Sequence, residues 1–421
     1  MVLKFSISNF YSVKDALIID FEAEQISTER TKILSDNTFI FNKRKYLKSI
    51  GIFGPNASGK SSIFKAILFC NSLVLNSHIN NEGISFNFMP FKFDGFYEKP
   101  SSFSINFILD EIEYEYSFSL TQKEIVSESL YYYPNKRKAK IFTRNEQVGK
   151  PKAEIFNFAE GFFVKPMDVA QSTGRNTLFI SRASQMDRDL AKKIYNFFLT
   201  EFYVGVPNIP DNYAVNLFSK NKKLLLKALK MADSDIVDIE VRKERINIPF
   251  ATNYFSNSFP PSVPNLPPET IVRFLTTHKQ NPNIKFDLYA EESSGTIQLF
   301  YLLLVLLDIC KNGKTLIVDE FDLSLHTELA QFIINIVHAS NNAQLLFTSH
   351  NTNLIDVKKM RRDQIYFTNK KEDCSTDFYS LFDFKNFREN MDAEKGYLQG
   401  RFDAIPYITS SIDEIRRLFG E

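Results

Sequence analysis

The sequence has no tryptophan, only three cysteines and almost no net charge. Its 421 residues carry 51 Lys and Arg against 50 Asp and Glu, a formal charge of +1. Because such a chain has no global field to draw it to DNA or to an anionic membrane, any surface of that kind must be a local patch. Cys70, Cys310 and Cys374 lie far apart and form no CxxC pair. This argues against a disulfide framework and a zinc site and fits a reducing, cytoplasmic location.

Long apolar runs and signal-peptide features are also missing. The longest apolar stretch, 297–310, is interrupted by Gln298 and Asp308. It is shorter than the roughly 20 residues of a membrane span, so we expect a buried helix and no membrane segment. Aromatic residues, in contrast, are abundant, with 42 Phe and 18 Tyr. Most of them fall on alternating or apolar-periodic positions, which is typical of core packing rather than of a base-stacking surface.

The pattern of apolar residues divides the chain into three predicted parts. In 1–156, short strands lead into a glycine-rich turn and a helix at 62–75, and alternation between 84 and 145 predicts an antiparallel sheet with one wet face. Residues 157–269 look mostly helical and end in a Pro-rich stretch, which we interpret as an insertion and a linker. In 270–421 strands and helices alternate, with a helix expected near Asn353 and a last helix at 412–419, which predicts a parallel α/β sheet.

The strongest motif lies between an apolar strand and the helix that follows it. It is GxxxxGK[ST], matched in full by Gly54, Pro55, Asn56, Ala57, Ser58, Gly59, Lys60 and Ser61, with Ser62 next. Glycines let the backbone N–H groups curl around phosphate oxygens, and the helix adds its positive N-terminal end. We expect Lys60 to reach the β- and γ-phosphates and the Ser61 hydroxyl to ligate Mg²⁺.

Two later strands end in residues suited to phosphate chemistry. The apolar run 315–318 is followed by Asp319 and Glu320. We expect Asp319 to ligate Mg²⁺ and Glu320 to act as the general base for water, although a solvated acidic turn would give the same pattern. The run 346–349 ends at His350, which could hydrogen-bond the γ-phosphate or the attacking water.

A fourth motif directly precedes the predicted apolar helix at 296–310. It consists of Ser293, Ser294, Gly295 and Thr296. Such residues at a helix start expose N–H and hydroxyl donors to an anion. Since Ser and Thr also cap ordinary helices, the motif by itself leaves both interpretations open.

Together, these motifs resemble the ABC-type ATPase heads of the SMC, RecF and OLD proteins. The serine–glycine motif would be their signature. Segment 9–13 resembles their N-terminal "NFRS" turn, with Tyr11 where Arg or Lys is usual, and the segment from Asp322 to His326 resembles their D-loop.

Two further segments narrow the resemblance. Residues 177–181 and 397–402 are similar to segments of the RloA-like (AAA_15) ATPases of bacterial phage-defence loci, although Asp403 replaces a glycine that is typical there. The Q-loop glutamine of ABC-type heads has no clear counterpart, because Gln122 and Gln171 both fit by position and neither has a motif.

The resemblance implies an α/β fold, a P-loop ABC-type ATPase head with an antiparallel β lobe and an inserted mainly helical region. In such heads the signature of one subunit contacts the γ-phosphate held by another. The resemblance therefore implies a homodimer or higher oligomer that closes around ATP and Mg²⁺ and reopens on hydrolysis, which is a switch. The implied function is a sensor or scaffold subunit of an anti-phage system that controls a separate effector chain, such as a nuclease.

The alternative is a RecF- or SMC-like DNA-repair ATPase that clamps DNA when ATP is bound. Basic clusters at 43–45, 136–138, 220–223 and 358–362 could contact nucleic-acid phosphates, although such runs are usually solvated faces. SMC heads carry a long heptad arm between their ATP motifs, and this sequence has no sustained heptads there. A transporter subunit and a non-hydrolysing scaffold fit less well, because of the missing Q-loop and the predicted catalytic pair.

Overall fold

The computed structural model divides the chain into two compact units, Met1–Gly205 with Ile309–Glu421 (unit 1) and Val206–Asp308 (unit 2). The residues it describes are 1–26, 28–80, 83–205, 211–232, 234–246, 269–323, 325–388, 390–405 and 416–417. The predicted linker at 247–269 and the predicted last helix at 412–419 lie almost entirely outside the described residues.

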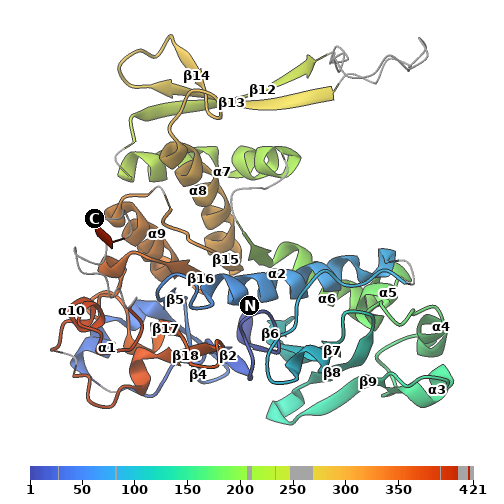
Figure 1. The fold of residues 1–421 in the computed structure, drawn as a ribbon. Coiled ribbons are helices and arrows are strands. Elements are labelled where there is room, and N and C mark those ends of the chain that lie inside the picture. Colours follow the sequence, from blue (N-terminus) through green and yellow to red (C-terminus); the bar gives the residue numbers. More distant parts are fainter. Residues whose placement is uncertain are drawn as a thin grey trace. The chain divides into compact units, whose positions relative to one another are not determined.

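Unit 1 contains a six-stranded sheet, which confirms the predicted α/β class (Figure 1). The strand order is β11-β15-β16-β5-β17-β18, with β18 antiparallel to β17 and the other neighbours parallel. The strands are β5 (Ser49–Phe53), β11 (Phe202–Val204), β15 (Thr315–Val318), β16 (Gln344–Ser349), β17 (Ile365–Lys370) and β18 (Thr376–Ser380). Every residue of β5, β15 and β16 is buried, as in parallel sheets covered on both faces.

The elements around this sheet follow the predicted alternation. They are α2 (Lys60–Asn76), α9 (Thr327–Ala339), α10 (Ala393–Leu398) and the 3₁₀ turns η5 (Thr352–Leu354), η6 (Arg362–Gln364) and η7 (Leu381–Asp383). The apolar side of α2 is buried as its periodicity predicts, at Ile63, Ala66, Ile67, Cys70, Leu73 and Val74. The helix expected near Asn353 is only a single 3₁₀ turn.

A seven-stranded antiparallel sheet forms the predicted β lobe of unit 1. Its order is β10-β9-β8-β7-β6-β1-β2. The strands are β1 (Val2–Ser8), β2 (Leu17–Asp20), β6 (Ser101–Leu109), β7 (Ile112–Leu120), β8 (Ile125–Tyr132), β9 (Ala139–Asn145) and β10 (Phe156–Phe158). Burial alternates along β6 and β7, so one face packs in the core and the other is partly solvated.

Three helices pack on the buried face of this sheet: α4 (Pro166–Gln171), α5 (Phe179–Gln185) and α6 (Asp189–Thr200). The rings of Phe107 on β6 and Phe197 on α6 are 4.5 Å apart. The remaining elements of unit 1 are α1 (Glu29–Ile33), η1 (Ser35–Asn37), β3 (Thr38–Phe41), β4 (Arg44–Leu47), η2 (Ser77–Ile79), η3 (Phe96–Glu98), η4 (Pro134–Lys136) and α3 (Lys152–Ile155).

Unit 2 differs from the insertion predicted at 157–269. Helices α4 to α6 share their core with the antiparallel sheet, so they belong to unit 1. Unit 2 adds a sheet to the predicted helices, because α7 (Asp211–Met231) packs on a three-stranded sheet of β12 (Ile236–Ile246), β13 (Glu269–His278) and β14 (Lys285–Asp287). Residues 294–308 of α8 (Ser294–Asn312) also belong to unit 2. The rings of Phe218, Phe274 and Phe300 join α7, β13 and α8.

Two segments, Lys60–Ile79 and Ser294–Asn312, are long and apolar enough to cross a membrane by length and composition alone. Core helices of globular proteins meet the same criterion. The apolar face of α2 packs into the core of unit 1, which gives it a structural role of that kind.

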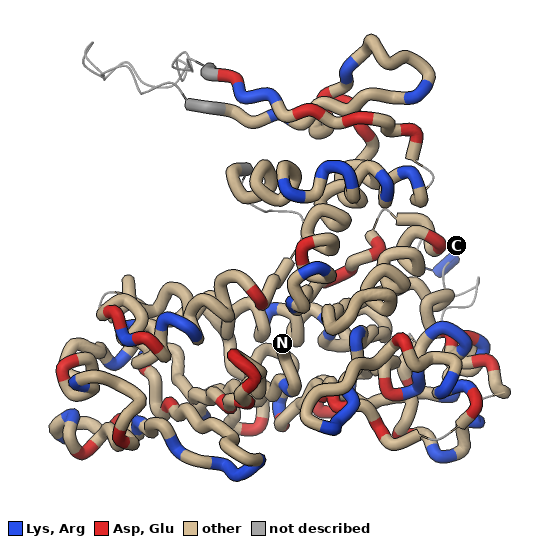
Figure 2. The backbone as a smooth tube through the Cα atoms, turned by 180° about the vertical axis from the view of Figure 1, so that it is seen from behind, with Lys and Arg blue, Asp and Glu red and all other residues tan. Residues whose placement is uncertain are grey.

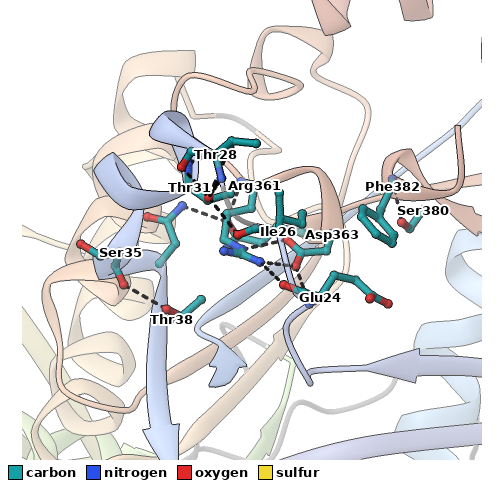
Figure 3. A network of polar contacts seen from close by, with 12 residues as sticks. Glu24, Ile26, Thr28, Thr31, Ser35, Thr38, Arg361, Asp363, Ser380 and Phe382 are labelled. Carbon is teal, nitrogen blue, oxygen red and sulfur yellow. Dashed lines mark hydrogen bonds and ion pairs between the residues drawn. The ribbon is translucent and has the colours of Figure 1, made fainter. Parts of the chain in front are cut away.

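A buried polar network joins the segment before β17 to the N-terminal part of the chain (Figure 3). Arg361 is 5% exposed, and its Nε and Nη2 donate to the two carboxylate oxygens of Asp363 at 2.9 and 2.6 Å. Arg361 Nη2 also donates to the carbonyl of Glu24, whose own N–H donates to Asp363. Because every partner is satisfied, the network fixes the geometry of this junction.

A second buried ion pair ties the antiparallel sheet to α5. Glu128 and Arg144 are both fully buried and lie 3.6 Å apart. The Glu128 carboxylate accepts the N–H groups of Phe179 and Ile180 at 2.7 and 3.1 Å and so caps α5. Burial raises the pKa of Glu128, and the charge of Arg144 opposes that shift. Arg144 also donates to the carbonyl of Thr177.

We predict that Glu128→Ala lowers the free energy of unfolding by about 3–5 kcal/mol, because it leaves the buried Arg144 with Glu146 as its remaining carboxylate partner and removes the acceptor of the buried N–H groups at the start of α5. Urea unfolding followed by circular dichroism measures this. Lys193→Ala is the matched control, since the Lys193–Asp110 pair is exposed and its loss should change little. Equal midpoints for the two variants would contradict the structural role of the buried pair.

Candidate functional site

The carboxyl ends of three neighbouring parallel strands bring the predicted motifs together. In the register, Val318 of β15 pairs with Phe347 of β16, and Ser349 of β16 pairs with Phe53 of β5. The residues that follow these strands therefore emerge at one edge of the sheet. They are Asp319 and Glu320 after β15, His350 after β16, and the glycine-rich loop after β5.

The loop turns into α2 at Gly59, which has φ +109. A Cβ atom at this position would lie 1.9 Å from the Thr376 hydroxyl oxygen, so both the conformation and the close approach require glycine. The hydroxyl of Ser58 in the loop is hydrogen bonded to the hydroxyl of Thr368 in β17 at 2.6 Å. The loop is thus held against β17 and β18.

Lys60 is turned back into the loop. Its Nζ donates to the carbonyl oxygens of Gly54 and Pro55 at 2.7 and 2.9 Å, and the residue is only 5% exposed. Burial lowers the pKa of Lys60 to about 8, while the charges of Asp319 and Glu320 act in the opposite direction. The ammonium group is therefore desolvated and held by two carbonyl dipoles, which suits it to accept an anion.

A chain of hydroxyls connects the predicted N-terminal turn to the start of α2. Thr376 donates to Ser12, and Ser12 donates to Ser62, each at 2.8 Å. The N–H of Thr376 also donates to the carbonyl of Ser12 at 2.7 Å. This places Ser62 in the support of the loop.

The two acidic residues after β15 are held by Thr348 of β16. Its hydroxyl donates to Asp319 Oδ1 at 2.5 Å and accepts the N–H of Glu320 at 2.8 Å. Glu320 has φ +47, a left-handed conformation that costs a non-glycine residue about 1–3 kcal/mol. The left-handed backbone of Glu320 therefore turns the chain sharply two residues after the end of β15.

Glu320 and His350 face each other across this edge. Glu320 Oε1 lies 4.0 Å from His350 Nε2, and both side chains are a little over two-fifths exposed. Burial is the main cause that lowers the pKa of His350, and the charge of Lys60 lowers it further, against the opposing effect of Glu320. The imidazole is therefore mainly neutral at pH 7, when one ring nitrogen donates and the other accepts.

The predicted D-loop follows directly. Asp322 Oδ2 accepts from Ser349 at 2.9 Å, and burial raises the pKa of Asp322. His326 is the N-cap of α9, where its Nδ1 accepts the N–H of Glu328 at 3.3 Å. Asp322 is thus tied to β16, whereas His326 serves the start of a helix. Ser324 lies outside the described residues.

The predicted signature belongs to unit 2. Ser293 Oγ accepts the N–H of Thr296 at 3.1 Å and is hydrogen bonded to its hydroxyl at 2.9 Å. Ser293 therefore caps α8, one of the two interpretations of the motif. Ser294 is exposed and Gly295 is partly exposed at the first turn of the helix, so their donors face outward.

Tyr11 and Gln122, whose roles the sequence left open, both make local contacts. Tyr11 has φ +49, donates its N–H to the carbonyl of Met89, and has Lys65 Nζ 5.5 Å from its ring. Gln122 donates to the carbonyl of Phe88 at 2.9 Å. The side chain of Gln122 therefore forms its hydrogen bonds with the 86–97 loop, and the Q-loop residue stays unassigned.

The donor set fits Mg²⁺ better than a protein-caged metal. In the described part of the chain, no group of three or more His, Cys, Asp or Glu residues could hold a metal ion. Mg²⁺ is usually held by one or two carboxylates together with substrate phosphates and water. Asp319 and the Ser61 hydroxyl, next to a phosphate-binding loop, are such a set.

Sequence reasoning gave no role to the hydroxyls of Thr348, Ser12 and Thr376. Thr348 is polar yet only 3% exposed, and a polar residue inside a strand predicted to be buried was the available signal. The partners of Ser12 and Thr376 are distant in sequence, so no local pattern could have indicated them.

Three solved structures of SMC head domains are similar to this chain at low sequence identity. A crystal structure of the SmcHead bound to the C-winged helix domain of ScpA shares 15% identity at a TM-score of 0.40, covering 91% of this chain and 99% of that chain. An SMC head domain from Thermotoga maritima shares 13% at 0.40, covering 90% and 98%. An Smc head domain derived from Pyrococcus furiosus, with an extended coiled coil and bound to the C-terminal domain of ScpA, shares 13% at 0.40, covering 91% and 97%.

No curated protein matches the sequence. A family profile does match, over residues 49–356, which begins at β5 and ends after the turn that follows His350. The matched region covers well over half of the chain and includes the loop, both acidic residues and the serine–glycine motif. The chain therefore belongs to the family described as "AAA domain, putative AbiEii toxin, Type IV TA system".

Proposed function

We propose that this chain is a Mg²⁺-dependent ATPase that acts as an ATP-switched sensor or scaffold. The observation that carries the proposal is the convergence of Lys60, Asp319, Glu320 and His350 at the carboxyl ends of adjacent parallel strands. Family membership supports it at the level of an ATPase domain.

Binding of ATP would begin at the loop of residues 54–61. Phosphate oxygens would replace the carbonyls of Gly54 and Pro55 as partners of Lys60, and the N-terminal end of α2 would add its partial positive charge. Mg²⁺, held by Ser61 and Asp319, would supply charge neutralisation to the phosphates. Ser62 would keep the first turn of α2 in place through Ser12.

Hydrolysis would use Glu320 as the general base. Glu320 would take a proton from water as the water oxygen bonds to the γ-phosphorus and the bond from that phosphorus to the β–γ bridging oxygen breaks. The products are ADP and inorganic phosphate. A neutral His350, 4.0 Å from Glu320, would donate one ring N–H to the γ-phosphate or orient the water.

The switch would require a second copy of the chain. Ser294 is exposed and Gly295 is partly exposed at the start of α8, where N–H groups are free to bind an anion. We infer that they contact the γ-phosphate bound by a second copy, as the resemblance to ABC-type heads implies. ATP would then favour a closed homodimer, and hydrolysis would release it.

A role in phage defence rests on the resemblance to RloA-like ATPases. The two segments that carry this resemblance have packing roles. Residues 177–181 lead into α5, where the N–H of Phe179 donates to Glu128. The rings of Tyr397 and Phe402 stack on the ring of Phe367 in β17, with centroids 5.6 and 5.1 Å away. Asp403 takes φ +53, so it can occupy the turn where glycine is typical. We propose a cytoplasmic subunit that controls a separate effector chain, and the family's toxin–antitoxin description is compatible with a two-component system.

Co-purification of the native protein with the products of neighbouring genes tests this role. A stoichiometric small partner that becomes toxic on phage infection supports it. Purification alone, together with strong ATP-dependent DNA binding, favours the repair clamp instead.

One observation favours a DNA-binding ATPase as the second candidate. Lys220, Lys223, Lys227 and Lys230 recur at helical spacing on the exposed side of α7, over about 15 Å. None of the four forms an ion pair with a described residue, whereas the neighbouring Lys222 pairs with Asp238. Figure 2 shows basic positions repeating along α7. Unpaired lysines in a row suit the phosphates of a nucleic-acid strand.

The Glu320→Gln variant tests the proposed base. We expect it to bind ATP but to release phosphate at least about a hundredfold more slowly, because a general base contributes that much. The closed dimer should accumulate with ATP, as measured by light scattering after gel filtration. Glu328→Gln, an exposed position on α9, is the control, and unchanged turnover in Glu320→Gln would sink the assignment.

ATP affinity should depend on pH through Lys60. Phosphates stabilise the charged ammonium, so the pKa of Lys60 is higher in the complex than the value of about 8 in the free protein. Binding above pH 8 therefore takes up a proton, and affinity should fall by up to about tenfold per pH unit. Titration with a fluorescent ATP analogue between pH 7 and 9.5 measures this. Lys60→Arg should show no such slope, and a flat wild-type profile would contradict the expectation.

The lysine row on α7 predicts a salt-dependent effect on DNA affinity. If this row contacts phosphates, Lys223→Gln with Lys227→Gln should weaken binding of a 30-base-pair duplex. It should also reduce the slope of log K against log salt by about 1.8, or roughly 0.9 per lysine. The control replaces Lys192 and Lys193 of α6, which are already ion-paired. Equal affinities for all three proteins would exclude this surface.

A further inference from the structure

We propose that Thr348 is a positioning residue that holds both acidic residues of the site through one hydroxyl. The inference rests on the proposed ATPase function and adds a residue to it. Thr348 would touch neither substrate nor metal. It would set where the carboxylate that binds Mg²⁺ and the carboxylate that acts as base can go.

The geometry is specific to this one side chain. The Thr348 hydroxyl has a single proton, which it donates to Asp319 Oδ1 at 2.5 Å, and its lone pairs accept the N–H of Glu320 at 2.8 Å. The carbonyl of Thr348 accepts the N–H of Phe321 at 3.3 Å. One residue of β16 therefore holds three successive residues after β15.

These bonds act on the two acidic residues in different ways. For Asp319, the bond engages one carboxylate oxygen and fixes the rotamer, which leaves the other oxygen for a metal. For Glu320, the bond holds the backbone in its left-handed conformation at φ +47. Without the hydroxyl, the Glu320 N–H would lose its hydrogen bond to Thr348. The backbone of Glu320 would then be held less firmly, and so would the position of its carboxylate.

The next residue along β16 makes a useful contrast. Ser349 is also fully buried, but successive side chains of a strand point to opposite faces, and its hydroxyl donates to Asp322 instead. The two hydroxyls thus bind different residues of the turn after β15. Thr348 serves the acids that face the loop, and Ser349 serves the D-loop.

The test compares Thr348→Val, which keeps the shape and removes the hydroxyl, with Thr348→Ser, which keeps the hydroxyl. Thr173→Val is the matched control, because Thr173 is equally buried, lies after α4 away from the site, and donates its hydroxyl to the carbonyl of Val169. The measurements are kcat, KM for ATP, and the affinity for Mn²⁺ in the presence of a non-hydrolysable ATP analogue, followed by electron paramagnetic resonance.

We expect Thr348→Val to lower kcat and Mn²⁺ affinity about 10- to 100-fold, with KM changed less than threefold. Thr348→Ser should restore both to within about threefold of wild type, and Thr173→Val should leave both unchanged. The inference is overturned if Thr348→Val keeps wild-type kcat and Mn²⁺ affinity, or if Thr348→Ser fails as badly as Thr348→Val. Absence of hydrolysis in the wild type would instead count against the proposed function, and the Mn²⁺ comparison would still decide the role of Thr348.

Discussion

The candidate site depends on the parallel register of β15, β16 and β5. Because β16 lies between the other two, its carboxyl end can reach the acids on one side and the loop on the other. Side chains alternate along a strand, so a slip of one residue would turn Thr348 away from Asp319 and bring Ser349 into its place. The shape of the site thus follows from the pairing of Val318 with Phe347, which directly precede Asp319 and Thr348.

Buried polar contacts at the opposite end of the sheet help to fix this register. Gln344, at the start of β16, accepts from the N–H of Val2 and from the Thr315 hydroxyl, and it donates to the carbonyl of Val2. It therefore joins β15, β16 and the first strand of the antiparallel sheet in one contact. Gln364 donates to both the carbonyl and the hydroxyl of Ser49 at the start of β5. A fully satisfied buried network of this kind disfavours alternative pairings, since a slip would leave its members unpaired.

Local patterns predicted the strands and the phosphate-binding loop well, because their signals are contiguous in sequence. The bounds of β5 and β15 coincide with the predicted runs, and α2 and α8 differ from theirs only at the ends. The unit boundary at 205 could not be seen, because only packing shows that α6 belongs with the antiparallel sheet. The support of the site was hidden for the same reason, since Thr376 and Ser12 are distant in sequence and meet only in the fold.

The charge balance of the site explains why a near-neutral chain can still bind a polyanion. Around the loop, the Asp319 and Glu320 carboxylates outnumber the single ammonium of Lys60, and His350 adds no charge when it is neutral. These four side chains, taken by themselves, would therefore repel a nucleotide. Attraction must come from the backbone N–H groups of the loop, from the start of α2 and from a divalent cation bound together with the phosphates. This makes the conformation of the loop, more than the net charge of +1, the property that decides whether the site can bind a nucleotide.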